Sequence, residues 1–410
     1  MIKNTWFMLI TMGTQYASTT LIFFLLARIW DVNIFGDFMF GFVTSNLLIL
    51  FVDYGFSLRL IKELSKSDYN KQNSLISNAL VAKLILSLLI SILVLIITII
   101  LNFNNTKLVI FMLLYVAAVF FSLTQFFLLP LRVINKFNIE SKVNIIVNLV
   151  FLITIIILIL FKCSPIMIAI GFVITRLIGL ILSYRTCFSF FSFKKSYVSF
   201  NQIKRVLIIN FPYAIQLIVS ALYFQIDVVF IEWYMDSYNV GIQQAAMKII
   251  SGLLILTTIF SNVYLPYISK MDDYKEIHKV NKKFTFIMSS TGVLITIFVL
   301  IFARLIINFL YGKAYNEAIN LLRLLSFLLF IRYSGVTYGV ILTVLNKQMQ
   351  RAFAVICALV FNVILNFVLV PTFGLKGAAI SALSTGILLN IIYFSMVKTN
   401  KRHELLRKVV

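Results

Sequence analysis

The chain has 410 residues, of which 61% are hydrophobic and only 12% are charged, and its mean hydropathy is +1.01. This much apolar surface cannot be hidden from water, so the composition excludes a soluble globular protein. The formal net charge is +22. Because the cations are spread over many short segments, membrane topology and anionic lipid headgroups explain them better than nucleic acid does.

The apolar residues fall into long runs. A helix needs about 20 apolar residues to cross the hydrocarbon core of a bilayer. Twelve runs meet this requirement, which predicts an all-α integral membrane protein with twelve transmembrane helices and no nucleic-acid partner. In chain order the runs cover residues 5–27, 34–58, 75–101, 107–129, 143–161, 165–184, 206–233, 240–267, 284–310, 318–345, 352–370 and 376–397.

Lysine and arginine are divided unevenly between the two sides of these runs. With the N-terminus inside, twenty-five of the 36 fall in inner segments and only five in outer segments or helix ends. Because positive residues concentrate in cytoplasmic loops, both termini are predicted to be cytoplasmic. The first run is longer and more polar than the core of a signal peptide, so we expect it to remain as a helix.

A motif in the first half of the chain returns about 205 residues later. Asp31-Val-Asn-Ile-Phe-Gly36 is echoed by Asp236-Ser-Tyr-Asn-Val-Gly241, and Asn144 and Asn148 are echoed by Asn362 and Asn366. The matches occur in the same order, which predicts two six-helix lobes related by a pseudo-twofold axis along the membrane normal. The predicted parts are an N-terminal lobe at 1–184, a basic linker at 185–205, a C-terminal lobe at 206–397 and a basic tail at 398–410.

Charged residues inside the predicted spans are candidates for a binding site, because such charges normally face the protein interior or a water-filled cavity. The predicted spans contain six cations and three acids, and this excess of positive charge favours an anionic cargo such as a phosphate ester. Arginine is well suited to bind a phosphate through two parallel hydrogen bonds. Cations near helix ends have an alternative, since their side chains can reach the interface. The cations are Lys83, Arg176, Lys248, Arg304, Arg323 and Arg332, and the acids are Asp53, Asp227 and Glu232.

Polar residues in three spans recur at helical spacing and therefore share one helical face. We interpret these faces as candidate walls of a polar cavity. In the alternative, Asp227 and Lys248 form an ion pair that holds two neighbouring helices together. The three faces contain Gln216, Ser220, Tyr223 and Asp227; Gln244, Lys248 and Ser251; and Asn46, Asp53 and Ser57.

Short motifs are spread over nearly the whole chain. They are Arg28-Ile-Trp-Asp-Val-Asn-Ile-Phe-Gly36, Asp53-Tyr-Gly-Phe56, Phe211-Pro-Tyr-Ala214, the run from Asp227 to Val229, Val240-Gly241 with Ala245-Ala246, Tyr311-Gly312, and Pro371-Thr-Phe-Gly-Leu-Lys-Gly-Ala-Ala379. In this order the motifs resemble those of the polysaccharide transporters, the O-antigen flippases of the multidrug/oligosaccharidyl-lipid/polysaccharide (MOP) exporter superfamily.

The resemblance implies a transporter that moves an undecaprenyl-diphosphate-linked oligosaccharide to the periplasmic leaflet of a bacterial inner membrane by alternating access. A polysaccharide polymerase and a chain-length regulator would be its partners. In the related lipid II flippases, an arginine ending helix one and an aspartate early in helix two engage the lipid headgroup, and Arg28 and Asp37 match these positions. A further arginine of those flippases has no counterpart in residues 46–51. Alternatively, Arg28 pairs with Asp31 or Asp37 at the outer rim.

Two other functions stay open at this point. A multidrug exporter would share the fold but would need an acidic or aromatic cavity for cationic drugs. A membrane polymerase would need a large outer loop and catalytic residues, which the sequence does not offer. No acidic pair stands at metal-ligand spacing with a histidine, so no metal site, cofactor or catalytic residue is predicted. A proton or Na⁺ could drive transport through Asp53, Asp227 or Glu232.

Overall fold

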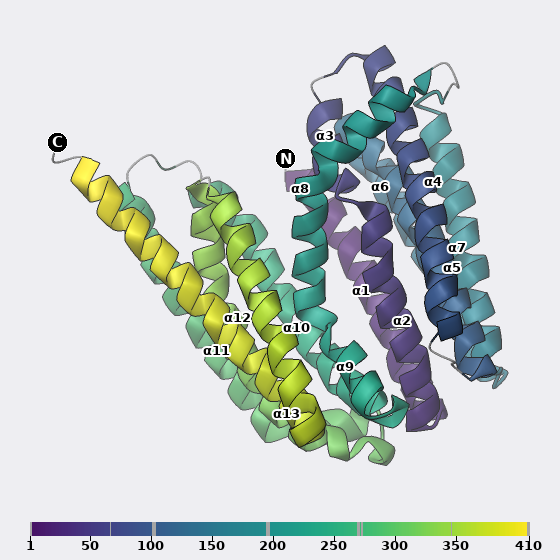
Figure 1. Ribbon diagram of the computed structural model, residues 1–410, viewed down its shortest axis with the longest axis vertical. Helices are drawn as coiled ribbons and strands as arrows, with labels where there is room; N and C mark the ends of the chain where they lie inside the picture. Colours follow the sequence, from purple (N-terminus) through teal and green to yellow (C-terminus); the bar gives the residue numbers. More distant parts are fainter. Residues whose placement is uncertain are drawn as a thin grey trace. The chain divides into compact units, whose positions relative to one another are not determined.

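A computed structural model describes residues 2–65, 67–100, 104–193, 197–268, 271, 274–345 and 347–407. Within these residues the regular structure is entirely helical, with thirteen α-helices and one short 3₁₀-helix (Figure 1). The chain forms two compact units. Unit 1 consists of Met1–Trp30 and Asp37–Ala221, and unit 2 consists of Asp31–Gly36 and Leu222–Val410. The predicted lobe and linker boundaries remain a prediction.

The first eight helices lie mostly in unit 1, except that α2 begins and α8 ends with residues of unit 2. Apart from the short polar helix α3, their order follows the predicted apolar runs. The capping of α7 shows how one such run begins: Pro165 occupies the first turn, and the Ser164 hydroxyl accepts a hydrogen bond from the Met167 backbone N–H. The helices are α1 (Ile2–Ile29), α2 (Val32–Asp53), α3 (Phe56–Leu64), α4 (Tyr69–Ile100), α5 (Asn105–Val133), α6 (Phe137–Leu160), α7 (Pro165–Phe188) and α8 (Phe200–Gln225).

The remaining helices belong to unit 2, where α12 packs against α10, α11 and α13. The longest, α13, contains a bend at Gly374, whose φ of 57° lies in the left-handed region that glycine adopts without strain. Figure 1 shows the two arms of α13 on either side of this bend. The elements are α9 (Asp227–Tyr234), α10 (Ser237–Ile268), α11 (Tyr274–Leu310), the 3₁₀-helix η2 (Lys313–Tyr315), α12 (Glu317–Val344) and α13 (Gln348–Arg407).

Ten helices of the described chain are long and apolar enough to cross a membrane. One of them, Gln348–Thr399, has 52 residues, which is enough for two crossings joined at the Gly374 bend. Large apolar side chains such as Leu88, Leu160 and Phe309 are more than half exposed, as expected for surfaces that face lipid. The protein is therefore a multi-pass membrane protein. The count of twelve helices and the cytoplasmic position of both termini remain predictions.

The structure differs from the predicted runs at two places. The run 34–58 is not one helix, because the chain turns at Tyr54 and Gly55, which have φ values of 44° and 71°. A side chain at Gly55 would meet Tyr213 at 2.6 Å, so glycine permits both the turn and the close approach of α8. The run 206–233 is likewise divided, with α8 ending at Gln225 and α9 beginning at Asp227.

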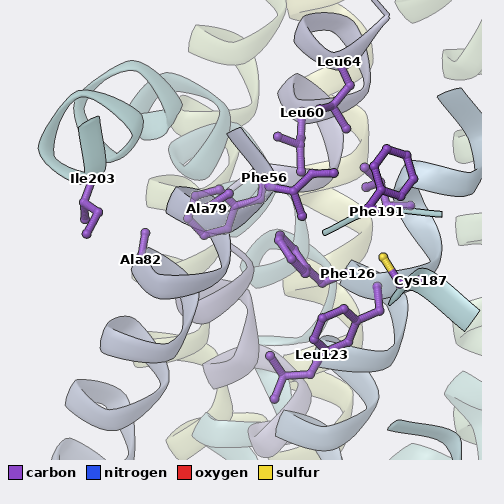
Figure 2. Close-up of a cluster of buried hydrophobic side chains, with 13 residues drawn as sticks. Phe56, Leu60, Leu64, Ala79, Ala82, Leu123, Phe126, Cys187, Phe191 and Ile203 are labelled. Atoms are coloured by element: carbon purple, nitrogen blue, oxygen red, sulfur yellow. The ribbon is translucent and has the colours of Figure 1, made fainter. Parts of the chain in front are cut away.

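The core of unit 1 at one end consists of apolar side chains from several helices (Figure 2). Phe56, Leu60 and Leu64 lie along one side of α3, as the spacing i, i+4, i+8 requires. They pack with residues of α4, α5 and α8, and with Cys187 and Phe191 at and beyond the end of α7. This cluster fixes the short helix α3, which carries the polar residues described below.

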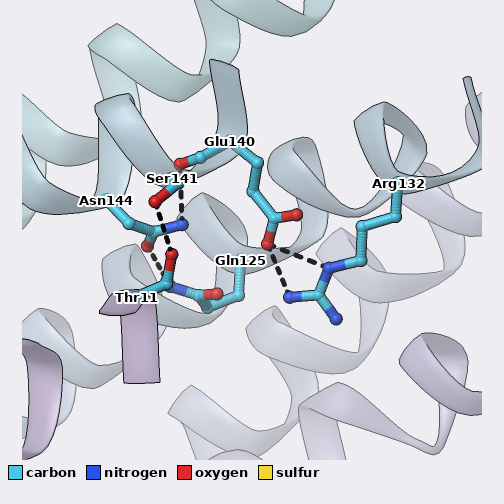
Figure 3. Close-up of polar contacts among 6 residues, drawn as sticks. All are labelled: Thr11, Gln125, Arg132, Glu140, Ser141 and Asn144. Carbon is cyan, nitrogen blue, oxygen red and sulfur yellow. Dashed lines mark hydrogen bonds and ion pairs between the residues drawn. The ribbon is translucent and has the colours of Figure 1, made fainter. Parts of the chain in front are cut away.

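A polar network ties α5, α6 and α1 together within unit 1 (Figure 3). The Arg132 guanidinium donates to the buried Glu140 carboxylate at 2.7 and 2.9 Å across the turn between α5 and α6. On the same side of α6, Gln125 donates to Asn144, and Thr11 donates to Ser141. Because Glu140 is buried, its pairing with Arg132 avoids an uncompensated charge.

The repeated motifs meet each other at the start of α2 and α10. A Cβ atom on Gly36 would lie 1.7 Å from the Ser237 carbonyl oxygen, and one on Gly241 would lie 2.6 Å from the Val32 carbonyl oxygen. Both glycines therefore allow two helix backbones to touch. This contact is one reason why Asp31–Gly36 belongs to unit 2.

Aromatic packing gives a second reason. The buried Phe35 ring contacts Tyr311 and Tyr315 edge to face, with ring centroids 6.5 and 5.9 Å apart. Burial, and to a lesser extent the negative charge of Asp31, raises the pKa of the Tyr315 hydroxyl above its ordinary value. Tyr315 acts here as a neutral packing residue, as an unshifted tyrosine also would at physiological pH.

Candidate functional site

A buried polar cluster lies in unit 2 around Asp227, the first residue of α9. The Asn366 amide donates to the Asp227 carboxylate at 2.8 Å and to the Ser381 hydroxyl at 3.0 Å. Asn362, one turn before Asn366, also contacts Ser381 and Thr385. The cluster thus joins α9 to both arms of α13. The Asn366 side-chain oxygen is buried and has no hydrogen-bond partner among the described residues.

Arg332 of α12 lies beside this cluster. Its guanidinium carbon is 4.2 Å from the centre of the Tyr223 ring and 4.9 Å from that of Phe224, so the charge rests on two aromatic faces. Arg332 also has a favourable electrostatic interaction with Asp227. Its buried Nε atom finds no hydrogen-bond acceptor in the described part of the chain. Sequence reasoning named Tyr223, Asp227 and Arg332, and the structure brings all three into one region of unit 2.

Arg176 of α7 has a similar environment in unit 1. Only 7% of the residue is exposed, and its guanidinium carbon is 4.2 Å from the Phe151 ring and 4.5 Å from the Phe121 ring. One of its terminal nitrogens is buried without a partner among the described residues. The Arg176 side chain is therefore held inside unit 1 and does not extend toward the membrane–water interface. Arg304 and Arg323, by contrast, are exposed on the surfaces of α11 and α12.

Lys83 and Asp53 neutralise each other in unit 1. The Lys83 ammonium is 2.5 Å from the Asp53 carboxylate, which also accepts a hydrogen bond from Ser122. Lys83 is 2% exposed and lies 5.6 Å from the centre of the Phe126 ring. This ion pair gives both residues a structural role. Cargo binding by Lys83 and ion coupling by Asp53 remain predictions.

Several other predicted residues lie apart from these groups. Asp37 pairs with Lys107 at 2.9 Å, Arg28 is exposed on α1, and Glu232 accepts a hydrogen bond from Ser237. The predicted face of helix seven is divided between the units: Gln216 and Ser220 belong to unit 1, whereas Tyr223 and Asp227 are buried in unit 2.

Gln244 and Lys248 line a small hollow in unit 2 of about 20 Å³, roughly the space of one water molecule. Gln244 donates to Gln243 there at 2.7 Å. The Asp227 carboxylate accepts a hydrogen bond from the Asn366 amide. The alternative pairing of Asp227 with Lys248 remains a prediction. Lys248 thus lies at a site too small for a headgroup.

A much larger pocket, of about 590 Å³, lies in unit 1 between α3, the start of α4 and α8. Sequence reasoning missed it, because its cations were counted only as inner charges that set the topology. The signal that could have found it is the occurrence of cations soon after the Asp53-Tyr-Gly-Phe56 motif and again near the start of α8. Its walls consist of Arg59, Glu63, Ser67, Lys71, Ser74, Leu75, Gln202, Arg205, Val206, Ile209 and Tyr213.

Among the described residues, no three histidine, cysteine, aspartate or glutamate side chains lie close enough together to hold a metal ion.

Residues 1–272 match the family model described as polysaccharide biosynthesis protein, and this match covers more than half of the chain. The chain belongs to the polysaccharide biosynthesis protein family.

Two curated bacterial proteins are similar in sequence to this chain. The "Putative O-antigen transporter" of Escherichia coli K12 is 24% identical over 412 aligned residues, which cover 97% of each chain. The capsular polysaccharide biosynthesis protein CapF of Staphylococcus aureus is 27% identical over 202 residues, about half of each chain. The predicted resemblance to the polysaccharide transporters is confirmed.

Solved structures share the fold of this chain. The lipid II flippase MurJ in an inward closed conformation matches with a TM-score of 0.80 at 17% identity, covering 96% of this chain and 87% of MurJ. An inward-facing multidrug resistance transporter of the MATE family, also of the MOP superfamily, matches with a TM-score of 0.75 at 13% identity, covering 96% of each chain. The all-helical fold implied by the resemblance to the MOP exporters and the lipid II flippases is confirmed.

Proposed function

We propose that this protein is a flippase that moves an undecaprenyl-diphosphate-linked oligosaccharide from the cytoplasmic to the periplasmic leaflet of a bacterial inner membrane. The family, the relatives and the MurJ-like fold support transport of a lipid-linked saccharide. Each sugar hydroxyl costs about 1–3 kcal/mol to bury without a partner. The headgroup therefore needs a polar path through the protein while the prenyl chain remains in lipid.

The observation that carries the proposal is the environment of Arg332. Its charge lies in a membrane-spanning helix and rests on Tyr223 and Phe224, and its Nε atom has no acceptor among the described residues. A guanidinium held in this way can still donate to an arriving phosphate oxygen, with which it forms strong charge-assisted hydrogen bonds. Arg176 has the same type of environment in unit 1.

In this proposal, the chain crosses the membrane twelve times as two pseudo-twofold-related lobes with cytoplasmic termini. The lobes expose the headgroup path to one leaflet and then to the other, so that binding shifts the balance between two states. A polysaccharide polymerase and a chain-length regulator would act on the delivered product.

A multidrug exporter is the second candidate, favoured by the likeness to the MATE fold. Two observations oppose it. The pocket of unit 1 is lined by three cations and one carboxylate, and the membrane-embedded Arg176 and Arg332 rest on aromatic rings. Such groups repel a cationic drug and attract an anionic headgroup.

The test is complementation of a strain that lacks the gene. Wild-type protein is expected to restore surface polysaccharide, and Arg332→Ala should lower it roughly tenfold or more, because one charge-assisted hydrogen bond contributes about 1.5–3 kcal/mol. Arg323→Ala is the matched control, since this arginine is exposed on the same helix. Both variants are first shown to reach the membrane in equal amounts.

The deletion strain should also accumulate lipid-linked repeats that face the cytoplasm. Unchanged polymer together with increased sensitivity to cationic drugs would establish the exporter instead. Full rescue by Arg332→Ala would remove the role given to this residue.

We further propose that Asp227 couples transport to an ion gradient. Oxygen atoms of Asp227, Asn362 and Asn366 lie together with two hydroxyl groups in a buried cluster, and such a set can hold a proton or coordinate Na⁺. In inverted vesicles, a Na⁺ or proton gradient is expected to stimulate transport by the wild type but not by Asp227→Asn. The control is Glu232→Gln on the same short helix. If Asp227→Asn retained gradient stimulation, the coupling site would lie elsewhere.

A further inference from the structure

We propose that the pocket of unit 1 between α3, α4 and α8 is a binding site for a phosphate-bearing headgroup, either a phosphate ester or a diphosphate. We call it the α3–α8 pocket, with the walls named above. It is distinct from the Arg332 region, because all of its residues belong to unit 1. Its volume of about 590 Å³ lies within the range of small-molecule sites.

The charges of the α3–α8 pocket favour an anion. Arg59, Lys71 and Arg205 contribute three positive charges, and Glu63 contributes the one carboxylate among the lining residues. Glu63 already pairs with Arg59, its neighbour one turn away on α3. Lys71 and Arg205 are exposed and come from different helices, so they can converge on a ligand from two sides.

Arg59 provides an unused donor inside the pocket. Its side chain is only 11% exposed. One terminal nitrogen contacts Glu63, while the other, Nη1, is buried and has no hydrogen-bond partner in the described part of the chain. A buried donor without a partner is unfavourable by itself. A phosphate oxygen in the pocket would satisfy it, with Glu63 holding the guanidinium in place.

The α3–α8 pocket is preformed because its helices are fixed to each other. The Asn78 amide of α4 donates to the Tyr197 carbonyl at 2.8 Å and to the Gln202 side chain at 2.9 Å, and its oxygen accepts from the Ser199 N–H. These bonds clamp the start of α8 onto α4. The apolar cluster of Figure 2 fixes α3 on the other side, through Phe56, Leu60 and Leu64. A rigid site loses less entropy when a ligand binds.

The walls also indicate what is attached to the phosphate. Leu75, Val206 and Ile209 form an apolar part of the lining next to the cations. Such a mixed wall suits a headgroup that remains joined to a hydrocarbon chain. The headgroup has two possible sources, the prenyl diphosphate of the cargo or an anionic phospholipid. The first rests on the proposed function, and the second does not.

The experiment uses the full-length protein in nanodiscs of zwitterionic lipid. Binding of three probes is measured: undecaprenyl diphosphate, phosphatidylglycerol and inorganic diphosphate. The test variant is Lys71→Ala/Arg205→Ala, whose exposed side chains can be shortened without disturbing the core. The matched control is Lys204→Ala, a neighbouring exposed cation of α8 that does not line the pocket. Arg59→Gln tests the unused donor.

The double variant is expected to bind at least one probe roughly tenfold or more weakly, whereas Lys204→Ala binds like the wild type. Selective loss of undecaprenyl diphosphate identifies the cargo as the source, and selective loss of phosphatidylglycerol identifies a membrane lipid. Loss of inorganic diphosphate alone supports the phosphate site without the chain. Equal binding of all three probes to the double variant and the wild type would overturn the proposal, while the Arg332 test would still decide the proposed function.

Discussion

Gly36→Ala is expected to destabilise the folded protein by about 3 kcal/mol or more, as severe overpacking does. The added methyl group would lie 1.7 Å from the Ser237 carbonyl oxygen, which is part of a helix backbone and cannot move aside like a flexible side chain. The start of α2 would have to separate from the start of α10. This separation would also disturb Phe35 between Tyr311 and Tyr315.

The measurement is the midpoint of thermal denaturation of purified protein in detergent, together with the amount found in the membrane. Gly252→Ala is the matched control, because no atom lies within 4 Å of its added Cβ and the same substitution favours the α10 helix. We expect Gly252→Ala to match or exceed the wild type. Equal midpoints for the two variants would show that the glycine contact does not hold the repeated motifs together.

Asp53→Ala is expected to have the second-largest effect, because it leaves the buried Lys83 charge without its carboxylate. Breaking a buried ion pair from one side costs about 3–5 kcal/mol. Lys83→Met should be milder, since Asp53 is 32% exposed and still accepts a hydrogen bond from Ser122. The double variant Asp53→Ala/Lys83→Met should recover most of the lost stability.

Denaturation midpoints of the four proteins form a double-mutant cycle that measures the coupling directly. Surface polysaccharide in complemented cells then separates structure from cargo binding. A stable double variant that restores polymer confines the pair to a structural role. A stable double variant that restores none would mean that at least one of the two residues acts in transport, through headgroup binding by Lys83 or ion coupling by Asp53.

The sequence predicted most of the helices, because a bilayer imposes a length and a polarity that can be read from hydropathy alone. It did not predict the turn at Tyr54 and Gly55 or the division at Ile226. Both lie inside apolar runs, and the hydropathy of a run does not depend on its backbone dihedral angles. The predicted runs 352–370 and 376–397 are joined by the bend at Gly374 and not by a loop. The residues between the two runs did not indicate this.

The candidate site was predicted only in part. Charge in an apolar run was enough to single out Asp227, Arg332 and Arg176, because buried charge is rare in membrane helices. The hydrogen-bond and ion-pair partners of these charged residues could not be assigned from hydropathy. Asn366 was recognised as a repeat of Asn148 and not as the partner of Asp227, since 139 residues separate it from that aspartate. The α3–α8 pocket was missed because its cations were already explained by the concentration of positive residues in cytoplasmic segments.

The aromatic contacts of Arg176 and Arg332 also bear on the speed of a transport cycle. A carrier is limited by release as much as by capture. An arginine locked to a carboxylate would have to exchange one strong partner for another at every turnover, and each exchange would add to the barrier. Rings hold the guanidinium more weakly. If these arginines bind the phosphate as proposed, their contacts with aromatic rings lower the free energy needed to exchange partners at each turnover.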